Sequence, residues 1–245
     1  MGSGGWSTKF FNSGPRQPSQ ARQRTIVTRI KICGLTRPEL ALAAAQAGAD
    51  FFGLVFYPPS HRNVTPEQAR DIVATVRKEG FSIPAVGVFV NCLVEEMNRL
   101  AEFCPLDYVQ LHGDETWELC RLLHRPVIKA VRIEKGRTTA DVAREIQTGL
   151  EVAGSKEVIP LLDTQLPGKY GGTGHLLDRG LVAELARRFR FLVAGGLTPQ
   201  NVAPLIKEAQ PWGVDVSGGV ETRKVKDPKK IEAFIRAVRR AEAAA

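Results

Sequence analysis

The 245-residue sequence lacks the patterns typical of metalloproteins, disulfide-linked domains and membrane proteins. Its four cysteines form no CxxC pair and its four histidines form no HExxH motif, so the common metal-ligand spacings are absent. Disulfide frameworks are typical of much shorter chains, and we therefore expect reduced thiols and no bound metal. No run of 18 apolar residues is present, which predicts that no segment spans a membrane.

Acidic residues are absent from the first 30 positions, and this asymmetry explains most of the net charge of +8. That stretch holds five basic residues, Lys9, Arg16, Arg22, Arg24 and Arg29, and without them the net charge is +3. The remaining charges of both signs are spread over the predicted helices. Nucleic-acid-binding proteins carry a basic stripe with interleaved aromatic residues, so we expect no nucleic-acid partner.

Residues 1–27 are rich in Gly, Ser, Pro, Gln and Arg and show little periodicity, which predicts a disordered N-terminal extension. Two origins fit this composition: an organelle transit peptide, or a tail left by cloning, which "MGSGG" resembles. A transit peptide would place the protein in an organelle such as a plastid, and otherwise we expect it in the cytoplasm. Residues 28–245 are predicted to form one catalytic domain.

Eight short apolar or β-branched runs recur from residue 27 onward, separated by segments with helical periodicity. The runs are 27–35, 50–56, 85–91, 107–113, 126–133, 158–164, 191–197 and 213–220. Apolar strands that alternate with helices indicate a parallel sheet covered by helices. Eight such units in one chain of this length favour a single (β/α)8 TIM barrel over an open doubly wound sheet, for which GxGxxG is missing after the first strand.

Several helix boundaries are marked in the sequence. Thr65 followed by Pro66 predicts an N-cap and a first helical residue, and Thr198-Pro199 repeats the pattern. The last segment carries Ile231, Phe234, Ile235 and Val238 at helical spacing, which predicts a helix that packs on the outside of the barrel.

Chemically useful side chains follow the predicted strands, and in a TIM barrel the C-terminal strand ends carry the active site. Cys33 ends the first run, Arg62 follows the second, Asp163 ends the sixth and Asp215 lies in the eighth. Asn91, His112, Gly113 and Asp114 follow the third and fourth runs. We therefore expect Cys33 and Asp163 to share one end of the barrel.

Two glycine pairs follow the seventh and eighth runs, Gly195-Gly196 and Ser217-Gly218-Gly219. Their backbone N–H groups lie where TIM barrels commonly bind a phosphate group. This predicts a barrel that binds a phosphate group at these two loops. The Gly-rich loop 166–178 after the sixth run is either a surface loop or a segment that folds over a substrate.

The segments "KICGLTRPE", "GLVFYPPSHR", "VQLHGDE", "AGGLTPQNV" and "VDVSGGVE" together resemble the phosphoribosylanthranilate isomerase family, in order along residues 29–240. The resemblance implies a (β/α)8 TIM barrel of the ribulose-phosphate-binding type. It also implies an Amadori rearrangement of N-(5-phosphoribosyl)anthranilate to 1-(2-carboxyphenylamino)-1-deoxyribulose 5-phosphate in tryptophan biosynthesis. General acid and base catalysis suffices for this reaction, and no cofactor is implied. The partner is a small-molecule substrate, and both a monomer and a homodimer occur in the family.

The resemblance also implies roles for individual residues. Cys33 corresponds to the general base, which a nearby cation such as Lys31 would activate, and Asp163 corresponds to the general acid. Arg62 matches the arginine that binds the anthranilate carboxylate, and Asp215 matches an aspartate close to the amino and sugar groups. The residues that correspond to the phosphate-binding site are Gly195, Gly196, Ser217, Gly218 and Gly219. For His112, both a catalytic role and a loop-orienting role stay open.

Two positions depart from the family pattern: Gly218 stands where a second serine is frequent, and His175 where lysine is frequent. One alternative is indole-glycerol-phosphate synthase, whose chemistry uses a lysine and a glutamate, but Lys129 has no partnering glutamate. Another is a dual-substrate isomerase, which uses two aspartates, whereas this chain has Cys33 at the first of those positions. A non-catalytic sugar-phosphate-binding barrel would keep the glycines but lose the acid or the base. The presence of both Cys33 and Asp163 favours an enzyme.

Overall fold

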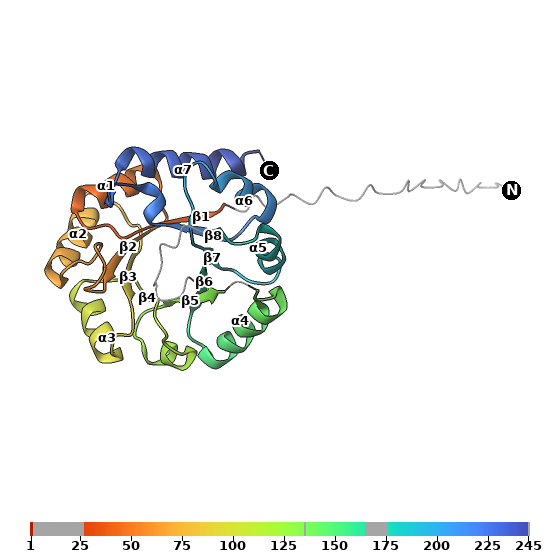
Figure 1. Cartoon of the computed structure of the whole chain (residues 1–245), viewed down its shortest axis with the longest axis horizontal. Coiled ribbons are helices and arrows are strands. Elements are labelled where there is room, and N and C mark those ends of the chain that lie inside the picture. Colours follow the sequence, from red (N-terminus) through yellow and green to blue (C-terminus); the bar gives the residue numbers. More distant parts are fainter. Residues whose placement is uncertain (2–26, 135, 165–175, 245) are drawn as a thin grey trace.

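Eight parallel strands close into a barrel with helices around it, as the alternating pattern predicts (Figure 1). The computed structural model describes residues 1, 27–134, 136–164 and 176–244. The strands are β1 Arg29–Cys33, β2 Phe51–Phe56, β3 Ala85–Phe89, β4 Tyr108–Leu111, β5 Val127–Ile133, β6 Val158–Thr164, β7 Leu192–Val193 and β8 Gly213–Val216. Each falls within one of the eight predicted runs, and β1 pairs with both β2 and β8, which closes the sheet. The (β/α)8 prediction is confirmed.

Helices follow the strands and cover the outer face of the barrel. They are α1 Pro38–Ala47, α2 Pro66–Lys78, α3 Val94–Phe103, α4 Thr139–Ala153, α5 Arg179–Ala186, α6 Val202–Ala209 and α7 Pro228–Glu242. A 3-10 helix, η1 Trp117–Leu122, replaces an α-helix between β4 and β5. A second, η2 Gly218–Val220, and a hairpin of β9 Glu221–Thr222 and β10 Val225–Lys226 precede α7. Among the described segments, no helix is both long and apolar enough to cross a bilayer.

The predicted helix starts are correct for α2 and wrong for α6. Thr65 accepts a hydrogen bond from the backbone N–H of Gln68, whose side chain accepts one from the N–H of Thr65, a complete capping box. α6 instead begins at Val202, because Asn201 Oδ1 accepts from the N–H of Thr198 and folds residues 198–201 into a turn. The apolar residues of α7 are buried against α1 and α6, as expected.

Side chains of the strands alternate between the barrel interior and the helix layer. In β1, Ile30 and Ile32 pack outward among the helices, while Lys31 and Cys33 face inward. The interior is filled by a small apolar cluster that includes Val86, Ile128, Leu161 and Leu192. Ring contacts among Phe51, Tyr108 and Trp212 close the N-terminal end. The opposite end, where the strands finish, is open.

Of the predicted N-terminal extension, residues 1–27, all but the two end positions lie outside the described residues. Most of the Gly-rich loop, residues 166–175 with His175, also lies outside them.

Candidate active site

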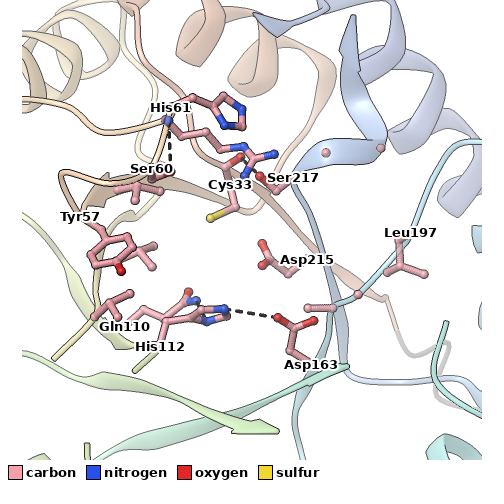
Figure 2. Close-up of a pocket in the computed structure, with 18 of the residues that line it drawn as sticks. Cys33, Tyr57, Ser60, His61, Gln110, His112, Asp163, Leu197, Asp215 and Ser217 are labelled. Atoms are coloured by element: carbon pink, nitrogen blue, oxygen red, sulfur yellow. Dashed lines mark hydrogen bonds and ion pairs between the residues drawn. The ribbon is translucent and has the colours of Figure 1, made fainter. Parts of the chain in front are cut away.

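A cavity of about 890 Å³ opens at the C-terminal ends of the strands (Figure 2). All nine predicted site residues line it: Cys33, Arg62, Asp163, Gly195, Gly196, Asp215, Ser217, Gly218 and Gly219. The sequence did not single out Tyr57, His61, Gln110 or Lys224, which also line it. Seven of the eight strands therefore contribute residues to this cavity, either from their C-terminal ends or from the loops that follow them.

Cys33 is the last residue of β1 and points into the cavity, with 7% of its surface exposed. Burial raises the pKa of its thiol, because a thiolate there loses solvation. The Lys31 ammonium opposes this effect, and the Asp215 carboxylate adds to it. Lys31 thus lowers the pKa of the thiol, as expected from the sequence, but burial outweighs this effect and the pKa of Cys33 lies above its ordinary value.

Lys31 and Asp215 form a buried ion pair below Cys33, with 2.9 Å between Nζ and Oδ1. Burial alone would lower the pKa of Lys31, but the charges and hydrogen bonds of Asp215 and Cys33 together outweigh it and the pKa is raised. Gly53 in β2 makes room for the pair, since a Cβ there would lie 2.9 Å from Cys33 Sγ and 3.2 Å from Lys31 Nζ. A fixed cation and a carboxylate are thus held directly beside the thiol.

Asp163 ends β6 on the wall opposite Cys33 and is 5% exposed (Figure 2). Its Oδ2 lies 3.3 Å from His112 Nε2, and His112 Nδ1 lies 3.1 Å from Gln110 Nε2. With Nδ1 accepting from the Gln110 amide, the neutral imidazole carries its proton on Nε2 and donates it to Oδ2. Oδ1 of Asp163 is buried and has no hydrogen-bond partner among the described residues. His112 therefore orients Asp163 and leaves one carboxyl oxygen for another molecule.

The two glycine loops follow β7 and β8, which lie between β6 and β1 in the barrel, and the loops touch each other. Gly195 and Gly196 have φ of 87° and 61°, conformations in which glycine needs no strain. A Cβ on Gly219 would lie 1.8 Å from the carbonyl oxygen of Leu197, so the loop after β8 packs against the backbone after β7. At Gly218 there is space, since the nearest atom to a Cβ would be an Arg62 nitrogen 3.6 Å away.

Ser217 links the glycine loop to the strand that carries Cys33. Its hydroxyl donates to the backbone carbonyl of Cys33 at 3.1 Å. The buried Lys226 Nζ donates to the Ser217 carbonyl at 3.1 Å and to its hydroxyl at 3.2 Å. The loop after β8 is therefore fixed relative to the thiol.

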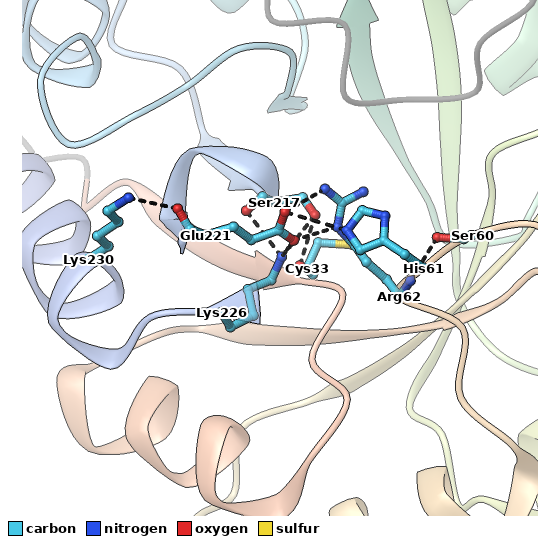
Figure 3. Close-up of polar contacts among 8 residues, drawn as sticks. All are labelled: Cys33, Ser60, His61, Arg62, Ser217, Glu221, Lys226 and Lys230. Carbon is cyan, nitrogen blue, oxygen red and sulfur yellow. Dashed lines mark hydrogen bonds and ion pairs between the residues drawn. The ribbon is translucent and has the colours of Figure 1, made fainter. Parts of the chain in front are cut away.

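Arg62 lines the cavity, but its guanidinium forms a two-point ion pair with Glu221 (Figure 3). The distances are 2.6 Å from Nε to Oε1 and 3.0 Å from Nη2 to Oε2. Lys226 Nζ lies 2.5 Å from the same Oε1. Two of the five N–H donors of Arg62 are therefore used by the protein itself, an arrangement that the sequence did not indicate.

Glu221 is the centre of this charge network. Burial alone would raise its pKa, but hydrogen bonds and charges from Arg62 and Lys226 outweigh it and lower the pKa to about 2. A carboxyl whose pKa falls on folding stabilises the folded state above its ordinary pKa of 4.5. That contribution disappears as the pH falls through about 2.

We expect Glu221→Gln to lower the free energy of unfolding by about 3 kcal/mol at pH 7, because Arg62 and the buried Lys226 lose their counter-charge. The difference from wild type should shrink as the pH falls from 4.5 to about 2. Urea denaturation at several pH values measures both effects. Glu232→Gln, on the exposed face of α7, is the matched control and should change stability by less than about 0.5 kcal/mol. A loss that does not depend on pH would contradict the charge network.

Lys129, the residue that a lysine-dependent barrel reaction would need, does not line the cavity. Its neighbours Ile128 and Ala130 face the barrel interior, so Lys129 points outward, where its Nζ donates to the carbonyl of Ala130. No group of three His, Cys, Asp or Glu side chains that could hold a metal ion occurs in the described part of the chain.

The family model for N-(5'-phosphoribosyl)anthranilate (PRA) isomerase matches residues 30–237, the whole barrel from β1 into α7. Relatives with the name N-(5'-phosphoribosyl)anthranilate isomerase include one from Dehalococcoides mccartyi, 44% identical over 87% of this chain and 97% of its own length. Another, from Pseudomonas putida, is 47% identical over 87% of this chain and 98% of its own length.

Solved structures agree. The isomerase from Thermotoga maritima superposes with a TM-score of 0.72 at 38% identity, covering 86% of this chain and 98% of that one. A phosphoribosyl anthranilate isomerase in complex with reduced 1-(o-carboxyphenylamino)-1-deoxyribulose 5-phosphate superposes with a TM-score of 0.71 at 36% identity, covering 86% and 98%. The family match extends over nearly all of the barrel and the related chains are covered almost completely, so this chain belongs to the N-(5'-phosphoribosyl)anthranilate isomerase family.

Proposed function

We propose that this chain isomerises N-(5-phosphoribosyl)anthranilate to 1-(2-carboxyphenylamino)-1-deoxyribulose 5-phosphate, with Asp163 as general acid and Cys33 as general base. The observation that carries the assignment is their placement. The Cys33 thiol and Oδ1 of Asp163, which has no hydrogen-bond partner among the described residues, face one cavity from opposite walls. An Amadori rearrangement needs a proton delivered to one atom of the substrate and a proton removed from another.

The first step is ring opening. Protonated Asp163 donates from Oδ1 to the furanose ring oxygen, the C1–O bond breaks, and the anilino nitrogen lone pair forms a C1=N iminium. His112 holds Oδ2 and so keeps Oδ1 directed at the substrate. The iminium cation then lies in the cavity that Asp215 also lines, where the carboxylate stabilises it.

The second step removes the C2 proton. Cys33 as thiolate accepts it, the C2–H electrons form the C1=C2 double bond, and the C1=N π electrons return to the anilino nitrogen, which gives a neutral enaminol. The enaminol tautomerises to the ketone product when the C2 hydroxyl loses its proton and C1 gains one. The raised pKa of the thiol suits a base that works only after ring opening. The nearby iminium cation then favours the thiolate, as does Lys31, and proton transfer becomes feasible at neutral pH.

Two anchors hold the substrate between these groups. The N–H groups of the Gly195-Gly196 and Gly218-Gly219 loops suit a phosphate, and the Ser217 hydroxyl fixes the second loop. The guanidinium donors of Arg62 that Glu221 does not use suit the anthranilate carboxylate. Glu221 then acts as a positioning residue for Arg62.

The direct test generates the substrate in situ from anthranilate, phosphoribosyl pyrophosphate and the transferase that joins them. Loss of the substrate's fluorescence is then followed with and without this chain. We expect saturable turnover far above spontaneous breakdown, with the aminoketose phosphate as the only product by mass spectrometry. A folded chain that binds product but gives no turnover would instead support a non-catalytic sugar-phosphate-binding barrel.

A further inference from the structure

The hairpin after the second glycine loop is built on an unfavourable turn. β9 and β10 pair with Val225 opposite Thr222 and Lys226 opposite Glu221, which leaves only residues 223–224 for the turn. Arg223 and Lys224 have φ of 51° and 64°. A two-residue turn with both φ values positive is normally made by Asn and Gly, because other side chains are strained there. This hairpin instead carries two long cationic side chains at its tip.

The base of the hairpin is fixed by buried charges (Figure 3). Lys226 is 4% exposed and binds Glu221 and Ser217, while Lys230 in α7 donates to the Glu221 carbonyl at 2.7 Å. Strained residues persist where their surroundings fix them. The tip is consequently held in a defined place beside the loop that Ser217 begins.

Only one of the two tip residues reaches the cavity. Lys224 lines it together with Gly218 and Gly219, whereas Arg223 does not. Among the described lining residues, the only lysine or arginine besides Lys224 is Arg62, which is already paired with Glu221. Lys224 is exposed and forms no ion pair with another described residue. Of the lysine and arginine side chains that line the described part of the cavity, Lys224 is therefore the one not held by a carboxylate, and it lies on the hairpin that follows the second glycine loop.

We propose that Lys224 is a substrate-binding residue that contacts the phosphate group held by the glycine loops. A phosphate monoester carries a charge near −2 at neutral pH, while backbone N–H groups supply dipoles but no net charge. A lysine on a rigid hairpin supplies a positive charge, and its backbone does not have to be ordered when the phosphate binds. The inference rests on the proposed function for the identity of the substrate, but not for the binding of phosphate.

The test compares Lys224→Gln with Arg223→Gln in the full-length chain. Both variants lose one positive charge and keep a long side chain at a positive φ, so only contact with the cavity distinguishes them. We expect Lys224→Gln to raise the KM for phosphoribosylanthranilate and the inhibition constant of inorganic phosphate about tenfold, the effect of one charge-assisted hydrogen bond. Its kcat should stay within about twofold of wild type, because the lost contact binds the phosphate equally in the substrate and in the transition state. Arg223→Gln should leave all three constants within about twofold.

Two further measurements make the result decisive. Lys224→Arg should restore phosphate binding, and the inhibition constant of anthranilate, which lacks phosphate, should not change in Lys224→Gln. Equal effects of Lys224→Gln and Arg223→Gln would mean a general field effect and would overturn the proposal. A weakened anthranilate inhibition with unchanged phosphate inhibition would place Lys224 at the carboxylate and overturn it as well. Calorimetric titration with inorganic phosphate needs no turnover, so a chain without isomerase activity would leave this test intact.

Discussion

Replacing Cys33 by Ser is expected to lower kcat by about three orders of magnitude, because a hydroxyl is a far weaker acid than a thiol and cannot form the base. Asp163→Asn removes the proton donor without changing the shape of the side chain, and a similar loss follows. The KM should change by less than about threefold in both variants, since neither residue belongs to the two anion anchors.

The pH dependence separates the two roles. Burial raises the pKa of Cys33 in the free protein, so the wild-type kcat/KM should keep increasing with pH beyond the range in which an ordinary thiol has fully ionised. That rise should vanish in Cys33→Ser and persist, at lower activity, in Asp163→Asn. Cys92→Ser and Asp71→Asn, which lie outside the cavity, are the matched controls and should retain wild-type rates. Retention of more than about a tenth of kcat in either active-site variant would contradict the assignment.

Gly219→Ala is expected to have the second-largest effect. The new methyl group would lie 1.8 Å from the Leu197 carbonyl oxygen and 3.1 Å from Thr198 Cα, both backbone atoms that cannot rotate away. The two glycine loops must therefore separate, which overpacks the rim by about 2–3 kcal/mol and disrupts the phosphate-binding site. We expect a KM increase of about 30- to 100-fold together with a lower melting temperature.

Gly218→Ala is the matched comparison, one residue away. Its methyl group would meet only an Arg62 nitrogen, at 3.6 Å, and its φ is not positive. Stability should change by less than about 0.5 kcal/mol, and the KM increase should be at least tenfold smaller than for Gly219→Ala. Thermal denaturation and phosphate binding measure the two consequences separately. Equal effects of the two substitutions would mean that the contact with Leu197 does not hold the loops together.

Local patterns are sufficient to predict the barrel and the end at which its site lies. Each strand is a short apolar run, and because parallel strands of a barrel end at one rim, the sequence alone predicts that Cys33, Asp163 and Asp215 lie together. What local patterns cannot supply is pairing between distant residues. Arg62 and Glu221 are 159 positions apart, and nothing in either segment predicts their contact.

The same limit explains two other differences. The direction of the pKa shift of Cys33 depends on burial, which outweighs the nearby Lys31 and is set by the whole barrel. The start of α6 depends on whether the Asn201 side chain folds back to Thr198. The sequence did contain a pattern that could have identified Glu221 as part of a charge network. Glu221 is an acid directly after the second glycine loop, and three basic residues follow it: Arg223, Lys224 and Lys226.

The protonated state of Cys33 has a consequence for chemical durability. Peroxides and alkylating reagents attack the thiolate form of cysteine, and oxidation proceeds from there to sulfenic and sulfinic acids. Because burial raises the pKa of Cys33, its thiolate fraction at neutral pH is smaller than that of an ordinary cysteine, although the residue lines an open cavity. In the proposed mechanism, bound substrate creates a cation beside the sulfur and thereby favours the thiolate. We therefore expect Cys33 to react more slowly with oxidants in the resting protein than an exposed cysteine does.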